Sequence, residues 1–189
     1  MYGKEVPDDF YEKIQHRLYQ RIGQELGMAH RVLDLGCGSC ELAGFLRKTY
    51  RQRVTGVDIS DGNLPRRDHP SNSRAPMRCI KGNAARLAFL RDGSVDAVVT
   101  TWALHEMDDR PGAVAEAYRV LRPGGKILIV DFPKGSLAQR LWNEDYLTVP
   151  GARTLLTAAG FVRVRARAIH KKQVILASGH RPANTGANA

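Results

Sequence analysis

The chain has 189 residues, 43% of them hydrophobic and 25% charged, a balance typical of one globular domain that buries its own core. Lysine and arginine outnumber acidic residues by 29 to 19, and the net charge of +10 admits nucleic acid, an anionic substrate or a membrane surface as partners. The basic residues are scattered, no apolar run reaches ~18 residues, and residues 1–9 lack the pattern of a signal peptide, so we expect a cytoplasmic protein without membrane insertion.

The first predicted element is an amphipathic helix within residues 1–29. Its apolar residues recur at four-residue spacing: Phe10, Ile14, Leu18, Ile22 and Leu26. Gly27 ends the pattern, as glycine commonly does at the end of a helix. We expect this helix to cover the sheet or a binding cleft, with Tyr11 and Tyr19 as candidates for the cleft wall.

A strand, a tight turn and a helix are predicted within residues 31–46. The aliphatic run before Gly36 is a strand, and Gly36 and Gly38 allow a turn with positive φ and close approach of a ligand to the backbone. Such a turn places a binding crevice at the carboxyl end of the first strand of an α/β sheet. Glu41 replaces the third glycine of a dinucleotide fingerprint, and Asp34 adds negative charge there. A cationic ligand therefore fits better than a dinucleotide.

The three cysteines are Cys37, Cys40 and Cys79. Their odd number, with two of them in the turn, argues against a disulfide framework. The C-x-x-C spacing of Cys37 and Cys40 also occurs in redox pairs, an interpretation that we do not favour here. No metal site is predicted, because no second cysteine pair or H-x-x-x-H lies nearby to complete four ligands.

Two polar residues follow predicted strands downstream of the turn. Asp58 ends a strand about 20 residues after the turn, where a carboxylate can accept hydrogen bonds from a ribose; capping of the next helix is the alternative. Residues 61–76 are rich in turn formers and are predicted to be mostly loop. After the strand at 77–81, the amide oxygen of Asn83 can accept a hydrogen bond from a ligand, and it also suits a helix cap.

The strand at 95–101 leads into a segment expected to form the floor of the site. His105 is the best general-base candidate, because its ordinary pKa of ~6.5 suits proton removal at neutral pH. A packing or hydrogen-bonding role for His105 is the alternative. Trp102 suits stacking on an acceptor or packing in the core. Residues 132–150 form a long connection that is a candidate substrate lid, with a helix packed on the core as the alternative.

The remaining elements complete the sheet. Helices are predicted at 111–121 and 151–159, a buried strand at 126–131, and an antiparallel hairpin from 161–168 and 174–177. The first strand of this hairpin has one basic face, formed by Arg163, Arg165 and Arg167. Residues 180–189 are polar and predict a flexible tail.

Several of these segments together resemble the motifs of class I methyltransferases that use S-adenosylmethionine, most closely the branch with the ubiquinone and menaquinone C-methyltransferases. They are Val32 to Gly38, Val54 to Ser60, Lys81 to Ala84, and Asp96 to Asp108 followed by Val120 to Phe132. The resemblance implies a single Rossmann-like α/β domain at 30–179, with a mostly parallel seven-stranded sheet and an antiparallel edge hairpin. Residues 61–76 depart from the family, which usually has a helix there.

The resemblance also implies the cofactor S-adenosylmethionine, with S-adenosylhomocysteine as the product. The residues that it assigns to cofactor binding are Asp34, Gly36, Cys37, Gly38, Asp58, Ile59, Asn83, Ala84, Thr101 and Trp102. Our first hypothesis is methyl transfer to a small-molecule acceptor by direct in-line displacement, by a monomer or homodimer. An RNA methyltransferase or RNA-associated protein is the alternative that the basic charge suggests. A non-catalytic S-adenosylmethionine-binding protein is a third.

Overall fold

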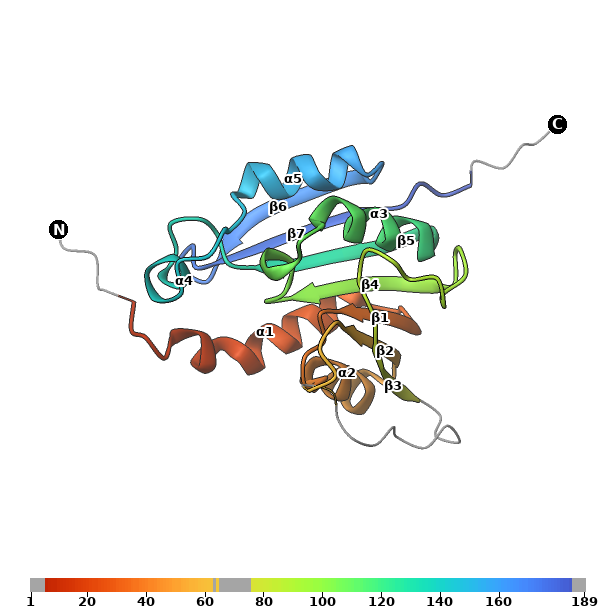
Figure 1. The fold of residues 1–189 in the computed structure, drawn as a ribbon, viewed down its shortest axis with the longest axis horizontal. Coiled ribbons are helices and arrows are strands. Elements are labelled where there is room, and N and C mark those ends of the chain that lie inside the picture. The colour runs from red at the N-terminus through yellow and green to blue at the C-terminus, as the bar shows by residue number, and fades with distance from the viewer. Residues whose placement is uncertain (1–5, 63, 65–75, 185–189) are drawn as a thin grey trace.

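The computed structural model describes residues 6–62, 64 and 76–184, which contain a seven-stranded sheet with helices on both faces (Figure 1). The strands are β1 (Arg31–Leu35), β2 (Arg53–Asp58), β3 (Met77–Lys81), β4 (Val95–Thr101), β5 (Leu121–Asp131), β6 (Val162–Ile169) and β7 (Val174–His180). The helices are α1 (Phe10–Leu26), α2 (Glu41–Tyr50), the 3-10 helix η1 (Leu104–Glu106), α3 (Arg110–Val120), α4 (Leu137–Leu141) and α5 (Val149–Ala158).

The order of the strands across the sheet is β3-β2-β1-β4-β5-β7-β6. Neighbouring strands from β3 to β5 pair in parallel, whereas β7 pairs antiparallel with both β5 and β6. This confirms the predicted α/β class and the antiparallel hairpin at one edge. The winding of the chain reverses between β1 and β4, and in open α/β sheets such a reversal leaves a crevice at the carboxyl ends of the strands.

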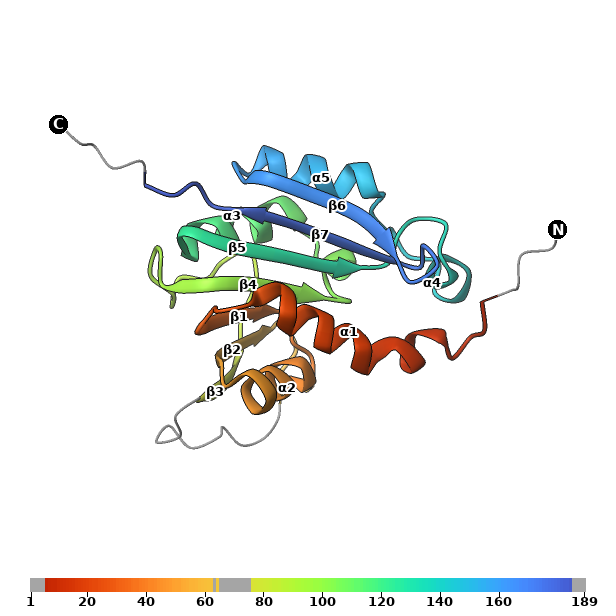
Figure 2. The same cartoon turned by 180° about the vertical axis from the view of Figure 1, so that it is seen from behind.

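The sheet has two apolar faces, because successive side chains of a strand point to opposite sides. On one face, α1 and α2 pack in a core that includes Val32 and Val99. On the other, α3 and α5 pack in a core that includes Leu33 and Val98. Figures 1 and 2 show the two helical layers from opposite sides. Burial on both faces explains why the central strands are nearly continuous runs of apolar residues.

Helix α1 has the bounds that the four-residue spacing predicts, and Gly27 follows its last turn with a φ of 57°. Its C-terminal part is held from two sides. Lys126 of β5 donates to the backbone oxygen of Glu25 at 2.7 Å and to its carboxylate at 2.9 Å, and the Tyr50 hydroxyl of α2 donates to the backbone oxygen of Gln20 at 3.1 Å. The helix is thereby fixed across the face that also carries α2 (Figure 2).

Capping residues shift two helix starts from their predicted positions. The Asp109 carboxylate accepts from the Gly112 amide at 2.8 Å, so α3 begins before residue 111. The Thr148 hydroxyl accepts from the Gly151 amide at 3.0 Å, and α5 begins at Val149 rather than at 151. Strand β5 also begins earlier than predicted, at Leu121, with a register shift against β4 before the regular pairing resumes.

The C-terminal segment is partly ordered within the residues described. Strand β7 extends through His180, and the Arg181 amide donates to the backbone oxygen of Gly125 at 2.9 Å. The Arg181 guanidinium donates to backbone oxygens that include that of Leu121, at 2.6 Å. The start of the predicted tail is thus held by the sheet. Residues 185–189, and most of the predicted loop at 61–76, lie outside the described residues.

Cys40 and Cys79 form a disulfide, which corrects the argument from the odd cysteine count against disulfide bonding. The parallel register places Cys79 beside Gly56 of β2, and a side chain at Gly56 would meet the sulfurs of Cys37 and Cys40 at 2.7 and 2.8 Å. The missing side chain at Gly56 therefore leaves room for the bridge. Cys37 keeps a free thiol, 2.8 Å from the sulfur of Cys40, so the C-x-x-C pair itself is not bonded.

Among the described helices, none combines the length and the apolar character needed to cross a membrane.

Candidate functional site

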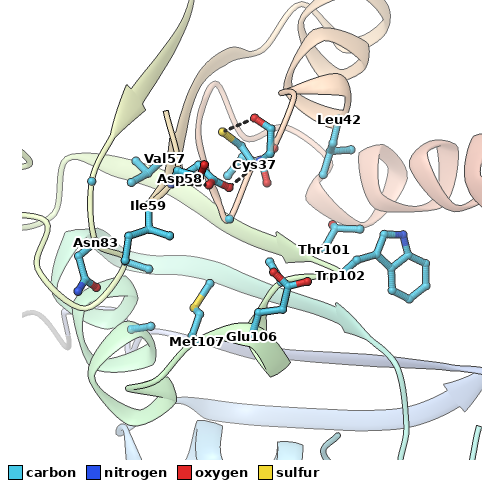
Figure 3. A pocket seen from close by; sticks show the side chains of 18 of the residues that line it. Cys37, Leu42, Val57, Asp58, Ile59, Asn83, Thr101, Trp102, Glu106 and Met107 are labelled. Carbon is cyan, nitrogen blue, oxygen red and sulfur yellow. Dashed lines mark hydrogen bonds between the residues drawn. The ribbon is translucent and has the colours of Figure 1, made fainter. Parts of the chain in front are cut away.

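A cavity of about 560 Å³ opens at the carboxyl ends of the parallel strands, next to the point where the winding reverses (Figure 3). Its lining includes all ten residues that the sequence assigned to a cofactor, from Asp34 through Trp102. Figure 3 shows Cys37 and Asp58 on one side of the cavity and Glu106 and Met107 on the other. The fold thus brings together residues from four separate segments of the chain.

The glycine turn is held against the end of β2 by its own backbone. The amides of Gly36 and Cys37 donate to the backbone oxygen of Val57 at 2.8 and 3.1 Å. Gly36 has a φ of 69°, and a side chain there would collide with the side chain of Ala103. Gly38 also has a positive φ, of 50°, but a side chain there would meet no atom within 4 Å. Close packing therefore requires a glycine at Gly36 in particular.

Asp58 links the turn to the loop after β2. Its carboxylate accepts from the Gly38 amide at 2.8 Å and from the Ser60 amide at 2.9 Å. A carboxylate has about four acceptor positions, so two backbone bonds leave capacity for a ligand in the cavity. The predicted alternative, a cap for the next helix, is not borne out among the described residues, because no helix follows Asp58 before β3 there and the Ser60 bond belongs to a turn.

Asp34 is the most unusual group in the cavity. It is 2% exposed, and its Oδ2 atom has no hydrogen-bond partner among the described residues. Burial, reinforced by the negative charge of Asp58, raises the pKa of Asp34 to about 7. Burial, with Asp34 and Asp58, also raises the pKa of the Cys37 thiol. An orphaned carboxylate oxygen near a second carboxylate fits a ligand that brings a positive charge or hydrogen-bond donors.

The far end of the cavity suits a flat ring. Ile59 is 68% exposed at its lining, an unusual exposure for a large aliphatic side chain. Ala84 and Asn83 lie beside it in the lining. The Asn83 side-chain oxygen accepts from the Ala85 amide at 2.8 Å, which is the local capping role that the sequence left open. Its amide nitrogen has no such bond among the described residues.

Thr101, the last residue of β4, and Trp102, which follows it, lie at the other end. Trp102 has a φ of 57° and stacks on Phe132, with ring centroids 4.2 Å apart and planes inclined by 9°. Stacking and cavity lining occur together for Trp102, so packing and ligand contact are compatible roles. The strained backbone at Trp102 is the kind of feature that clusters at ligand sites.

The structure places His105 outside the residues that line the cavity. Its ring is 4% exposed, and Nδ1 lies 2.7 Å from Oδ1 of the buried Asp131. Burial lowers the pKa of His105, but the hydrogen bond and charge of Asp131 outweigh it, and the net shift is upward. Glu106, the next residue, does line the cavity. The sequence therefore located the right segment after β4, but His105, the residue selected in it, is buried beside the cavity.

Helix α1 forms another part of the wall, where sequence reasoning named Tyr19 but missed Gln15. Gln15 and Tyr19 of α1 line the cavity and are joined by a 3.1 Å hydrogen bond from the Gln15 amide to the Tyr19 hydroxyl. Tyr19 was a candidate, whereas Tyr11 instead packs on Phe132 at 4.7 Å. Met107 also lines the cavity, and it belongs to the segment from Thr101 to Asp108 that was expected to form the floor of the site, although no role was assigned to it. Like Glu106, it can be found from the sequence by its position shortly after β4, where the winding of the chain reverses.

The predicted lid, residues 132–150, contributes no residue to the lining of the cavity. It contains α4 and an extended stretch. Trp142 stacks on Tyr11 of α1 at 5.9 Å, and Tyr146 lies edge-on to Phe132, the first residue of the segment, at 5.7 Å. The helix predicted as the alternative is thus present, and the lid role stays a prediction.

Comparison with known proteins gives the family. A methyltransferase-domain family model matches residues 33–129, just over half of the chain. The chain is 33% identical over 152 residues to the 2-phytyl-1,4-beta-naphthoquinone methyltransferase of Arabidopsis thaliana chloroplasts, which covers 73% of this chain and 58% of that protein. It is 33% identical over 129 residues to the O-methyltransferase rstn1 of Aspergillus nomiae, covering 66% of this chain and 57% of that protein.

The chain therefore spans less than two thirds of the length of these two relatives. Among solved structures, the complex of the Haloferax volcanii Trm112 methyltransferase activator with a methyltransferase matches with a TM-score of 0.73 at 18% identity, over 95% of this chain and 96% of that one. This likeness extends the shared fold to nearly the whole chain. With the family model across the glycine turn and the central strands, the comparisons show that this chain belongs to the class I, S-adenosylmethionine-dependent methyltransferases.

Proposed function

We propose that the protein binds S-adenosylmethionine in the cavity and transfers its methyl group to a small-molecule acceptor. The observation that carries this proposal is the buried carboxylate of Asp34, which lines the cavity with the glycine turn and whose Oδ2 atom has no hydrogen-bond partner in the described part of the chain. A sulfonium and an ammonium are cationic groups that such a carboxylate favours. A dinucleotide would instead bring phosphates against Asp34 and Asp58.

The residues fit the parts of this cofactor. Asp58 has acceptor capacity left for ribose hydroxyls, and Ile59 with Ala84 offers apolar surface for the adenine ring. Asn83 presents its side chain beside that surface. Gly36 and Gly38 keep the turn free of side chains, so the backbone can approach the amino-acid part.

Little side-chain chemistry is needed for the transfer. When bound, the cofactor supplies a methyl group on a positively charged sulfur, and the carbon–sulfur electron pair stays with sulfur as the acceptor bonds to the methyl carbon. The chain has to align the acceptor in line with that bond and exclude water. Thr101, Trp102 and Met107 lie where they can do this. A proton that leaves the acceptor in the cavity meets Glu106 before His105, whose base role stays a prediction.

The acceptor class is also a proposal. The relatives are named for a naphthoquinone and for O-methylation, which supports a small molecule with a ring or an oxygen nucleophile. The wall beside Trp102 supports the same class, because the aromatic residues behind it form a rigid surface against which a flat acceptor can be held.

A second candidate acceptor, RNA, is favoured by one observation. A separate cavity of about 370 Å³ is lined by Lys126, Arg153, Arg163, Arg165 and Arg167, with Glu25 as the acidic member. The predicted basic face of β6 therefore faces a hollow that can take phosphate groups. This hollow shares no lining residue with the first cavity, so RNA bound there would have to reach across the molecule.

The test is incubation of the full chain with methyl-tritiated S-adenosylmethionine and a cell extract. We expect label in a soluble or organic-extractable small molecule. Label in acid-precipitable, nuclease-sensitive material would overturn the small-molecule acceptor and favour RNA. No protein-dependent incorporation, with cofactor binding retained in calorimetry, would favour the non-catalytic alternative.

A further inference from the structure

Three potential metal ligands meet beside the cofactor cavity. Nε2 of His105 lies 3.2 Å from Oε2 of Glu144 and 3.8 Å from Oε1 of Glu106. One ligand atom from each of the three residues lies within 4.8 Å of the others. Glu106 and Glu144 come from different connections, after β4 and after α4, so the fold assembles the group. This explains why the spacing of the sequence predicted no metal site.

Asp131 occupies Nδ1 of His105 and leaves Nε2 beside Glu144 and Glu106. The Asp131 carboxylate, 1% exposed, accepts from the backbone amides of His105 and Phe132 at 3.0 and 2.8 Å, and Nδ1 of His105 lies 2.7 Å from it. An ionised carboxylate only accepts, so Nδ1 carries a hydrogen; in the neutral ring the lone pair is then on Nε2, where a cation would replace the second proton of the charged ring. A buried carboxylate behind one imidazole nitrogen is the usual support for a histidine that binds metal through the other.

Negative charge is poorly compensated here. Three carboxylates, those of Glu106, Asp131 and Glu144, surround one imidazole. Among the described residues, His105 is the only cationic or titratable basic side chain within ion-pair distance of Glu106 or Glu144. Arg110 passes close by, but its guanidinium is bound to Asp145 and to the backbone oxygen of His105, at 3.0 and 2.6 Å.

An independent feature points to a missing partner. Tyr146 is 3% exposed, and its buried hydroxyl has no hydrogen-bond partner among the described residues. Its ring lies 4.9 Å from the ring of His105, one of the three residues of the group. A buried hydroxyl without a partner is costly, and a ligand or a water held on a metal would satisfy it.

We propose that Nε2 of His105 and the carboxylates of Glu106 and Glu144 bind one divalent cation. One imidazole and two carboxylates suit a first-row ion such as Mn²⁺, Fe²⁺, Co²⁺ or Zn²⁺. Three protein ligands leave coordination positions open, as in catalytic rather than structural sites. Because Glu106 also lines the cavity, the open positions lie at its edge. The ion takes the place of a proton on Nε2, so this role of His105 and the base role are alternatives.

This inference rests on the proposed function in one respect, the chemical class of the acceptor. If methyl transfer takes place in this cavity, the ion favours an acceptor with an oxygen donor, such as a phenol or an enol. An oxygen bound to a divalent cation loses its proton at lower pH, which removes the need for a side-chain base. The cation site itself requires neither the cofactor nor the acceptor.

The experiment is a titration of the full chain with Mn²⁺ alone, in which electron paramagnetic resonance counts the free ion. We expect one saturable site per chain. Glu144→Gln, a change of nearly equal size at a half-exposed position, should weaken it by at least about tenfold, whereas the matched control Asp145→Asn, one residue away and outside the group, should bind within about twofold of the wild type.

Absence of saturable Mn²⁺ binding at millimolar concentrations would overturn the inference. So would equal affinity of Glu144→Gln and the wild type, because binding would then lie elsewhere. The affinity for S-adenosylmethionine in the absence of metal is measured on the same samples. Retained cofactor affinity with no metal site would leave the proposed function standing, and lost cofactor affinity with an intact metal site would do the reverse.

Discussion

The two ends of the cavity are built in different ways. The glycine-loop side, residues 34–38, 58–60 and 82–85, is held mainly by backbone amides, as in the bonds to Val57 and Asp58. The aromatic side, formed by Tyr11, Trp102, Phe132, Trp142 and Tyr146, reaches the cavity through Trp102 alone and is held by ring contacts between residues far apart in the chain. The first side is suited to a constant cofactor. Under the proposed function, an exchange of side chains on the second side would change the acceptor without disturbing the first.

Phe132→Ala should give the largest effect, and mainly on stability. Phe132 is 6% exposed and lies against the other four rings of the aromatic side, including Trp102 and Tyr11. We expect the free energy of unfolding in urea to fall by about 3–5 kcal/mol. Trp142→Ala, on the same side but 51% exposed, is the control and should cost about 1–2 kcal/mol. Equal losses in the free energy of unfolding for both variants would mean that the contacts of Phe132 with the other four rings add no more stability than those of Trp142.

Gly36→Ala should break the glycine-loop side. The new side chain would collide with Ala103 while the backbone holds a φ of 69°, so we expect a loss of roughly 2–4 kcal/mol in stability or an equivalent loss of cofactor affinity. Gly38→Ala has the same positive φ without the collision and should cost only about 1–2 kcal/mol. Chemical denaturation measures the loss of stability and calorimetry the loss of cofactor affinity. Equal losses in Gly36→Ala and Gly38→Ala would mean that the collision with Ala103 does not contribute.

Asp58→Ala should weaken S-adenosylmethionine at least about tenfold, or ~1.4 kcal/mol, because it removes the ribose acceptor and releases the amides of Gly38 and Ser60. Asp61→Ala is the matched control, since that exposed carboxylate pairs with Lys81 at 3.1 Å. Isothermal titration calorimetry measures both. Unchanged affinity in Asp58→Ala would remove the ribose role.

Asp34 should make cofactor binding depend on pH. Its pKa is raised to about 7, so the folded free protein keeps a neutral carboxyl below that value and an ionised one above it. Affinity for a cationic ligand should therefore rise between about pH 5.5 and pH 7, by up to about tenfold per pH unit. In Asp34→Asn residue 34 no longer titrates, so cofactor affinity should change less with pH than in the wild type.

The same raised pKa makes Asp34 a cost to the free protein. The folded state prefers the protonated carboxyl, so stability falls as the pH rises from the ordinary pKa of 3.8 to about 7 and stays lower above it. Asp34→Asn should consequently unfold at a higher temperature than the wild type at pH 8 while binding the cofactor less tightly. A lower unfolding temperature for Asp34→Asn at that pH would contradict the burial of an uncompensated charge.

Arg163→Glu combined with Arg165→Glu should have the smallest effect. Both side chains belong to the basic hollow and not to the cofactor cavity, and exposed charges are screened within about 10 Å at ordinary salt. We expect cofactor affinity and turnover of a small acceptor to stay within about twofold of the wild type. A large loss of turnover, with cofactor affinity retained, would favour RNA as the acceptor.

The sequence by itself determined the glycine-loop side. The turn, the acid at the end of β2 and the Asn83 loop are local features, since strand ends, positive φ and residue spacing are all encoded within a few neighbouring residues. Residues after β4 were also located, because the carboxyl end of a central strand at a reversal of winding must face the crevice. That rule cannot tell which of His105 and Glu106 points inward, because their orientation depends on η1 and on Asp131.

Only the tertiary structure decided the aromatic side, the Cys40–Cys79 bridge and the meeting of His105 with Glu144. Each joins residues separated by tens of positions, and none has a local pattern. Their contacts arise from the register of β2 against β3 and from the path of the chain after β5. Local backbone preferences act over a few residues, whereas side-chain contacts across a fold exist only once the sheet and its helices have packed.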